Sequence, residues 1–308
     1  MINKEVGKIL TIIGKVESIN TGEHFCNTTL VIENNLNINI KLEKKDVQTL
    51  KIGKIYQFEV IGVQRDLEIV LKNLKHQKIE EVKSKAELAH YYSVFYQYAP
   101  LSLKEIQVGI ESYLSGINNE KIKEVTNLIY QKYKEDFYIH PAATKFHHAY
   151  IGGLSYHTLT MLKMIDPMVS IYPYLNKDLL YAGAILHDIS KIDEISGVDG
   201  EYTVSGQLIG HIVLAVLEIE RLSLELGYQD SEEMLLLKHV ILSHHGLLNY
   251  GSPKRPQIGE ALMLWYIDTI DSKFTVLGEE LADLKPGEFT QAVPVLDKVR
   301  FYKSKKMN

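Results

Sequence analysis

The stretch that decides the fold reads YAGAILHDISKIDE and spans residues 181–194. An apolar helical run leads directly into His187 and Asp188, and Lys191 follows one helical turn later. Burial of such a pair is costly unless it is hydrogen-bonded, ion-paired or bound to a metal. The His187–Asp188 pair therefore needs partners from elsewhere in the chain.

Candidate partners lie on both sides of this stretch, on or beside further amphipathic helices. Taken singly, each is explained as a core histidine or a solvated aspartate. Taken together, several of them on the apolar sides of successive helices favour a metal site, because imidazole and carboxylate are the ligands that divalent Mn, Fe, Zn and Co prefer. The candidates are His147, His148, His157, His211, His239, His244, His245, Asp268 and Asp271.

Composition sets the wider limits. The 308 residues are 45% hydrophobic and 24% charged, with a net charge of −5, which predicts two or three soluble globular domains and gives no global sign of nucleic-acid binding. The single cysteine, Cys26, excludes an internal disulfide and a thiolate metal site. No apolar stretch reaches the ~18–20 residues of a membrane helix, and the N-terminus does not resemble a signal peptide. These features predict a cytoplasmic protein.

Residues 1–83 predict an all-β domain. Short alternating runs occur at 8–19, 28–32, 36–42, 55–63 and 67–74, with a polar helical insert at 44–50. The turn signals between them are Thr21-Gly22, Asn34-Asn35, Gly53-Lys54 and Arg65-Asp66. Five such strands fit an OB-fold barrel, which commonly holds single-stranded nucleic acid. The alternative is a barrel without a ligand of its own. The candidate binding residues are Lys41, Lys44, Arg65 and Lys72, with Phe25, Tyr56 and Phe58 as the aromatic candidates.

Helical patterns dominate after a polar Lys- and Glu-rich boundary at 75–85. We expect helices at 86–98, 102–114 and from 118 or 119 to about 133, where Ser102 and Glu105 form a capping box. These elements predict a helical extension at 84–135, packed on an all-α domain at 136–308. The tyrosine-rich extension also allows a homo-oligomer interface.

The order of His157, then His187-Asp188, then an aspartate in a late helix resembles the H…HD…D signature of the HD phosphohydrolase superfamily. The additional His211 and His244-His245 resemble its two-metal versions. Three longer stretches are similar to the YhaM type of bacterial 3′-5′ exoribonuclease, which joins an OB domain to an HD domain. They read PAATKFHHAYIGGLSYHTLTM, GAILHDISK and ILSHHGLLNYGSPKRPQIGEALMLWYIDTIDSK.

The resemblance implies roles for these residues. One ion would be held by His157, His187, Asp188 and Asp268, and Asp188 would bridge to a second ion held by His211, His244 and His245. Asp268 is preferred over Asp271, which would orient a ligand. His147 and His148 stay open as ligands, ligand partners or helix caps, and His239 is expected to be structural.

Three basic residues are candidates for contacts with the phosphates of the substrate. With Asp188, Lys191 is a candidate catalytic residue that meets the scissile phosphate, the alternative being an exposed lysine. Lys254 and Arg255 lie between prolines in a stiff basic loop suited to phosphate, the alternative being a solvated turn.

The resemblance implies a metal-dependent exonuclease that degrades single-stranded RNA, and secondarily single-stranded DNA, to nucleoside 5′-monophosphates. Two Mn²⁺ ions are expected, with Fe, Co or Mg as alternatives. A phosphohydrolase of nucleotides or cyclic dinucleotides, and a nucleic-acid-binding protein with an inactive HD site, are the competing interpretations.

Overall fold

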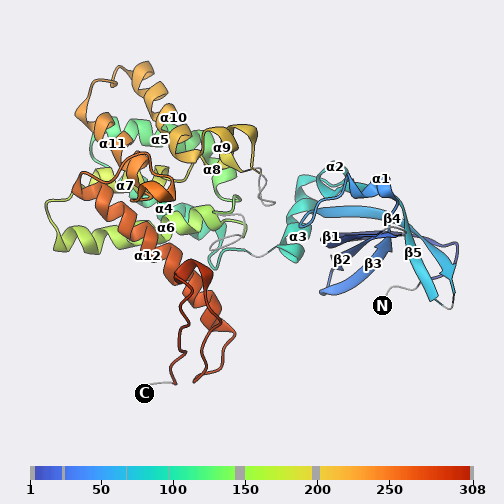
Figure 1. The fold of residues 1–308 in the computed structure, drawn as a ribbon. Helices are drawn as coiled ribbons and strands as arrows, with labels where there is room; N and C mark the ends of the chain where they lie inside the picture. The colour runs from blue at the N-terminus through green and yellow to red at the C-terminus, as the bar shows by residue number, and fades with distance from the viewer. Residues whose placement is uncertain are drawn as a thin grey trace. The chain divides into compact units, whose positions relative to one another are not determined.

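The computed structural model describes residues 4–22, 25–66, 68–96, 98–142, 150–195 and 202–305. The chain divides into two compact units, Met1–Gln97 and Tyr98–Asn308. The first unit is built from strands and the second from helices (Figure 1). The predicted fold class, a β-barrel followed by an all-α domain, is confirmed.

Five strands close the barrel of the first unit in the order β1-β2-β3-β5-β4. All neighbouring strands are antiparallel except β3 and β5, which pair in parallel. The short helix α1 (Lys44–Val47) lies between β3 and β4, as the polar insert predicted. This topology is that of an OB-fold. The strands are β1 (Ile9–Thr21), β2 (Cys26–Ile32), β3 (Leu36–Lys41), β4 (Ile55–Arg65) and β5 (Glu68–Lys78).

Alternation along the strands fills the barrel. Val16, Leu30 and Leu71 are fully buried, and their sequence neighbours point outward, because successive side chains of a strand face opposite sides. Asn34 and Asn35 adopt positive φ angles of 70° and 56° between β2 and β3. Two such residues make the tight turn that matches the twist of a hairpin.

Two helices continue from β5 within the first unit. They are α2 (Ile79–Val82) and α3 (Lys85–Phe95). Phe95 packs with Ile55 and Ile79 in a small cluster of their own. The contact boundary therefore follows Gln97, one helix later than the boundary expected after residue 83, and α3 counts with the barrel rather than with the helices that follow.

The second unit is a helical bundle around α7. Every residue of α7 from Leu179 to Leu186 is buried, and α7 packs against α4, α5, α6, α11 and α12. The helices are α4 (Leu103–Ser115), α5 (Glu120–Phe137), α6 (Gly153–Ile171), α7 (Lys177–Leu186), α8 (Lys191–Glu194), α9 (Val204–Leu208), α10 (His211–Leu226), α11 (Glu232–Ser243) and α12 (Gly259–Ala282), with 3₁₀ turns η2 (Leu248–Tyr250) and η3 (Pro294–Leu296).

Side-chain caps fix where the helices begin. Ser102 and Glu105 form the predicted capping box at α4, with reciprocal hydrogen bonds of 3.3 and 3.0 Å. Asn119 accepts from the backbone of Ile122 and so begins α5. Capping satisfies backbone donors that lack a partner inside the helix.

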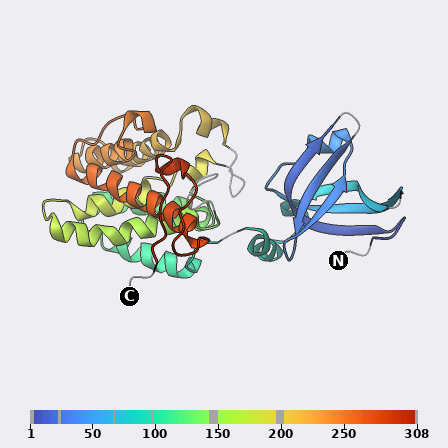
Figure 2. The ribbon, with the colours of Figure 1, turned by 60° about the horizontal axis from the view of Figure 1, so that its bottom comes forward.

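The segment after α12 folds back along that helix (Figure 2). Val293 and Leu296, at η3, pack on Val276 of α12. A β-bridge between Val293 and Val299 closes this C-terminal turn. In the part of the chain that the structure describes, no helix is both long enough and apolar enough to span a bilayer.

Candidate metal centre

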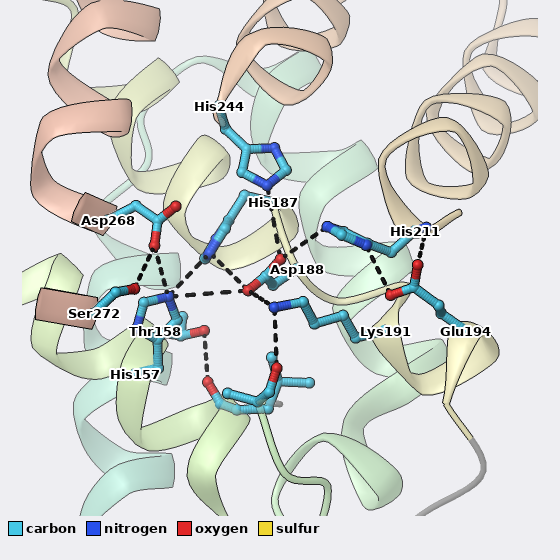
Figure 3. Close-up of polar contacts among 12 residues, drawn as sticks. His157, Thr158, His187, Asp188, Lys191, Glu194, His211, His244, Asp268 and Ser272 are labelled. Atoms are coloured by element: carbon cyan, nitrogen blue, oxygen red, sulfur yellow. Dashed lines mark hydrogen bonds and ion pairs between the residues drawn. The ribbon is translucent and has the colours of Figure 1, made fainter. Parts of the chain in front are cut away.

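The apolar helix α7 delivers the His187–Asp188 pair into the interior. The helix ends at Leu186, and the next two residues are 0% and 4% exposed. The Nδ1 atom of His187 donates to the Ala184 carbonyl over 2.8 Å, which turns Nε2 toward the carboxylate of Asp188 (Figure 3). The pair is therefore buried, as the apolar helix before it predicted.

A first group of ligand atoms combines α6, α7 and α12. His157 Nε2 lies 3.3 Å from His187 Nε2 and 3.3 Å from Asp268 Oδ1. The three ligand atoms lie within 4.8 Å of one another. Two imidazole nitrogens and one carboxylate oxygen thus face a common point.

A second group shares Asp188 with the first. Its members are Asp188, His211, His244 and His245. Asp188 Oδ1 lies 3.3 Å from His211 Nε2 and 3.7 Å from His244 Nε2, whereas Oδ2 lies 3.3 Å from His187 Nε2. One carboxylate therefore faces both groups, one oxygen to each.

Outer hydrogen bonds fix the orientation of four imidazoles. In each ring Nδ1 faces an acceptor, so the neutral ring carries its proton on Nδ1 and directs the lone pair of Nε2 to the interior. The acceptors are Asp271 Oδ2 for His157 (2.6 Å), the Ala184 carbonyl for His187 (2.8 Å), Glu194 Oε2 for His211 (2.8 Å) and the Ile241 carbonyl for His244 (2.7 Å).

Three of the inward atoms are buried without a hydrogen-bond partner. They are Asp188 Oδ1, His211 Nε2 and His244 Nε2. An unsatisfied buried polar atom costs about 1–3 kcal/mol, and here three potential metal-ligand atoms converge. A divalent cation would satisfy all three, and with its nitrogen and oxygen donors the site fits Mn, Fe, Zn or Co.

Lys191 is part of this interior rather than a surface lysine. Its Nζ lies 2.8 Å from Asp188 Oδ2 and donates to the Ala142 carbonyl over 3.0 Å. Burial alone would raise the pKa of Asp188, but the Lys191 ammonium and His187 hold it well below its usual range. Asp188 is therefore ionised and held in position at neutral pH.

Burial also keeps the His244 imidazole neutral. It lowers the pKa of His244 to about 3, since a charged imidazolium is poorly solvated there. His244 is therefore neutral at physiological pH, the form that binds a metal.

The two aspartates of α12 differ in what they contact. Asp268 belongs to the first ligand group, and its Oδ1 also accepts a 3.2 Å hydrogen bond from Ser272. Asp271 is buried and contacts the opposite nitrogen of His157. Asp268 therefore groups with the potential ligand atoms, whereas Asp271 contacts the outer nitrogen of His157.

Glu194 was not anticipated from the sequence. It is buried on α8, and it accepts hydrogen bonds from Nδ1 (2.8 Å) and the backbone N–H (3.2 Å) of His211. Burial would raise the pKa of Glu194, but the hydrogen bond and charge of His211 lower it. The available signal was its place inside the HDISKIDE stretch, six residues after Asp188.

A cavity of about 730 Å³ adjoins the ligand groups and is lined in part by His245 and Asp268. Lys254 and Arg255 are exposed on the loop before α12 and do not line this cavity. His239 accepts a hydrogen bond from the Gln257 backbone over 3.0 Å, which suits its expected structural role. His147 and His148 lie outside the described residues.

The basic residues predicted to bind nucleic acid lie at two separate places on the barrel. Lys41 and Lys72 are register partners on β3 and β5, and Lys44 begins α1 just after β3. Arg65 lies four residue pairs further along the β4–β5 ladder, at its hairpin end. Lys72 forms an exposed 3.2 Å ion pair with Glu43.

The aromatic candidates of the barrel also divide. Tyr56 and Phe58 are 1% and 0% exposed and belong to the core, so neither is available to stack on a base. Phe25 is 52% exposed. A single exposed ring leaves little of the stacking surface that the sequence suggested.

Comparison with known proteins places this geometry in a family context. The HD domain model matches residues 154–273, the segment that supplies both ligand groups. The chain is 43% identical to "3′-5′ exoribonuclease YhaM" of Geobacillus sp. (strain WCH70) over 68% of this chain and 65% of that protein. It is 43% identical to the protein of the same name from Bacillus subtilis (strain 168), over 68% and 67%, respectively.

A longer alignment reaches a Listeria welshimeri protein with the same name. It is 39% identical over 248 residues, which are 78% of this chain and 79% of that protein. The other two alignments span about two thirds of the length of each relative.

Proposed function

Because this chain belongs to the YhaM family of 3′-5′ exoribonucleases, we propose that it is a metal-dependent enzyme that degrades single-stranded RNA from the 3′ end. The family membership expected from the sequence is confirmed by these relatives. The observation that carries the proposal is the pair of ligand groups joined by Asp188, with three buried inward atoms that lack partners.

Each group would hold one divalent ion. His157, His187 and Asp268 with Asp188 Oδ2 would hold the first, and Asp188 Oδ1 with His211, His244 and His245 the second. Two such ions would supply a water of lowered pKa and would stabilise the attacking and leaving oxygens of an in-line phosphoryl displacement. Mn²⁺ is our expected metal, with Fe, Co or Mg as alternatives.

Three further residues around the ions would neutralise the phosphate charge or hold the ligand rings in position. Lys191 uses two of its three N–H donors on Asp188 and Ala142. Its third N–H donor is available to a phosphate oxygen. We therefore propose that the Lys191 ammonium contacts both the Asp188 carboxylate and the scissile phosphate. Glu194 and Asp271 hold the rings of His211 and His157, and so fix the directions of their lone pairs.

The barrel would bind the single-stranded RNA substrate. Lys41, Lys44 and Lys72 lie near one another on the barrel surface and suit contacts to a phosphate backbone, with Arg65 as a contact further along. We extend the proposal to single-stranded DNA as a second substrate, to nucleoside 5′-monophosphates as products, to a homo-oligomer and to a cytoplasmic location. The buried, unpaired Cys26 suits a reducing compartment.

A phosphohydrolase of nucleotides or cyclic dinucleotides is the second candidate. The cavity of about 730 Å³ beside the ligands, within the usual size range of small-molecule pockets, favours it. Such an enzyme would turn over small substrates regardless of the charge on the barrel.

The test is digestion of 5′-labelled single-stranded RNA in the presence of Mn²⁺. The proposal predicts a ladder of labelled products that shortens from the 3′ end, with mononucleotides released. The His187→Ala and Asp188→Ala proteins should leave the RNA intact. If the wild-type protein leaves RNA intact with Mn²⁺, Fe²⁺, Co²⁺ and Mg²⁺, the proposal fails, and turnover of cyclic dinucleotides alone would establish the second candidate.

A further inference from the structure

The cavity beside the ligand groups has a second wall that the metal chemistry does not use. One side is α12, with Trp265, Thr269 and Ser272. The other side is the C-terminal turn, with Val295 and Asp297. The turn is anchored on α12 through the packing described above, so this wall is part of the folded unit.

Part of this wall is apolar and aromatic. Trp265 lines the cavity, and its indole is held in place by Tyr266, whose ring centroid lies 5.0 Å away, and by Gly246. Leu247 and Val295 line the same cavity. Flat aromatic and apolar surface is what a nucleobase packs against.

One carboxylate lines the same cavity. Asp297 lines the cavity, and among the described residues its carboxylate has no hydrogen bond or ion pair. Asp297 and the next residue, Lys298, adopt left-handed backbone angles, with φ of 55° and 59°. Left-handed non-glycine residues carry a backbone cost and cluster at ligand sites.

These features match the chemistry of one end of an RNA strand. With the phosphate to be cleaved at the candidate ligands Asp268 and His245, the adjoining cavity can take the nucleoside on the 3′ side of that phosphate. That nucleoside is the terminal one, and its ribose carries free 2′- and 3′-hydroxyl groups. A carboxylate accepts hydrogen bonds from two neighbouring hydroxyls and repels a terminal phosphate.

Resting on the proposed function, we propose that this cavity is the subsite for the 3′-terminal nucleoside. The base packs on the wall formed by Trp265, Leu247 and Val295, and the Asp297 carboxylate accepts hydrogen bonds from the ribose diol. The subsite thereby selects a strand that ends in an unmodified ribonucleotide over one that ends in a deoxynucleotide or a 3′-phosphate.

Binding is measured first, independently of catalysis. Trp265 is the only tryptophan of the chain, so its fluorescence reports occupation of the cavity. Adenosine 5′-monophosphate is titrated with Mg²⁺ and compared with its 2′-deoxy analogue. We expect both to change the emission, with the ribonucleotide bound about tenfold or more tightly, since a hydrogen bond to a charged group has about this effect.

Two variants share the same backbone setting and isolate the carboxylate. Asp297→Gly removes it, and glycine adopts the left-handed angle freely. Lys298→Gly makes the same backbone change one residue later, at a position that does not line the cavity. The preference for the ribonucleotide should vanish in Asp297→Gly and remain in Lys298→Gly.

The strand assay supplies the second readout. Three 5′-labelled RNAs ending in a ribonucleotide, a 2′-deoxynucleotide or a 3′-phosphate are compared by the rate of the first cleavage. Wild-type protein should favour the first strand, and Asp297→Gly should equalise the rates. Equal ratios in wild type and Asp297→Gly, or no change in Trp265 emission with either nucleotide, would overturn the inference. Failure of the wild type to cleave any strand would instead overturn the proposed function.

Discussion

The barrel and the helical unit bury polar side chains for different reasons. In the barrel, Thr28 donates to the Ser18 carbonyl and Asp46 accepts from the Glu43 backbone, so each supports the nearby chain. In the helical unit, buried histidines and aspartates converge on Asp188 and leave inward atoms without partners. The contrast teaches that local hydrogen bonding explains the first set, whereas the second set needs a ligand that folding alone does not supply.

The largest difference between the two units is expected when one buried acid is neutralised in each. Asp188→Asn should remove RNA degradation almost completely, by more than the roughly 10- to 100-fold that loss of an outer ligand partner costs, because it weakens both ion sites at once. Initial rates on 5′-labelled RNA measure the effect.

The matched control is Asp46→Asn. Asp46 is 8% exposed against 4% for Asp188, and an amide oxygen can still accept from the Glu43 backbone. We expect rates close to wild type. Similar losses in the two variants would mean that Asp188 is only a structural acid.

A smaller effect is expected from the residue that holds a ligand. Glu194→Gln weakens the acceptor for Nδ1 of His211 and should lower activity about 10- to 100-fold, with partial rescue at high Mn²⁺ concentration. The exposed Glu225→Gln on α10, where Glu225 pairs with Arg221, serves as the control. Full activity in Glu194→Gln at limiting Mn²⁺ would contradict the positioning role.

A substitution at Gly246, in the turn after His245, tests how closely Trp265 packs against the site. A Cβ atom on Gly246 would lie 2.0 Å from the Trp265 ring, and φ is +73° there. Gly227 has the same φ with nothing within 4 Å of the added atom. Gly246→Ala should lower Tm by roughly 2–10 °C more than Gly227→Ala, because overpacking adds about 1–3 kcal/mol. Equal Tm values would show that Trp265 moves aside without cost.

The smallest effect should come from the barrel surface. Lys41→Ala and Lys72→Ala together should raise KM for long RNA several-fold while kcat stays near wild type. The slope of log affinity against log salt should fall by about 0.7 for each lost phosphate contact. Lys104→Ala, at an exposed position of α4 in the other unit, is the control. An unchanged slope would remove these two lysines from the RNA contact.

Much of the fold could be predicted because its signals are local. Strand alternation, the Asn34-Asn35 turn and the Ser102–Glu105 capping box each involve neighbours in sequence. The contact boundary follows α3 rather than preceding it, because Phe95 packs with Ile55, a residue 40 positions earlier in the sequence.

The site shows the same limit. The candidate ligand histidines could be recognised because imidazoles recur on apolar helices, whereas Glu194 resembled any other acidic residue of a polar stretch. Lys191 gave no sign that it would be buried with the Ala142 carbonyl, since that contact crosses 49 residues. The core positions of Tyr56 and Phe58 likewise follow from the closure of the barrel rather than from their spacing.

We propose that the helical unit holds two ions that share Asp188. Metal analysis of protein reconstituted with Mn²⁺ and freed of excess ion, with Asp188→Asn in parallel, tests this most directly. We expect two ions per wild-type chain and fewer than one in Asp188→Asn. A wild-type chain that binds no ion, or an Asp188→Asn chain that still binds two, would contradict it.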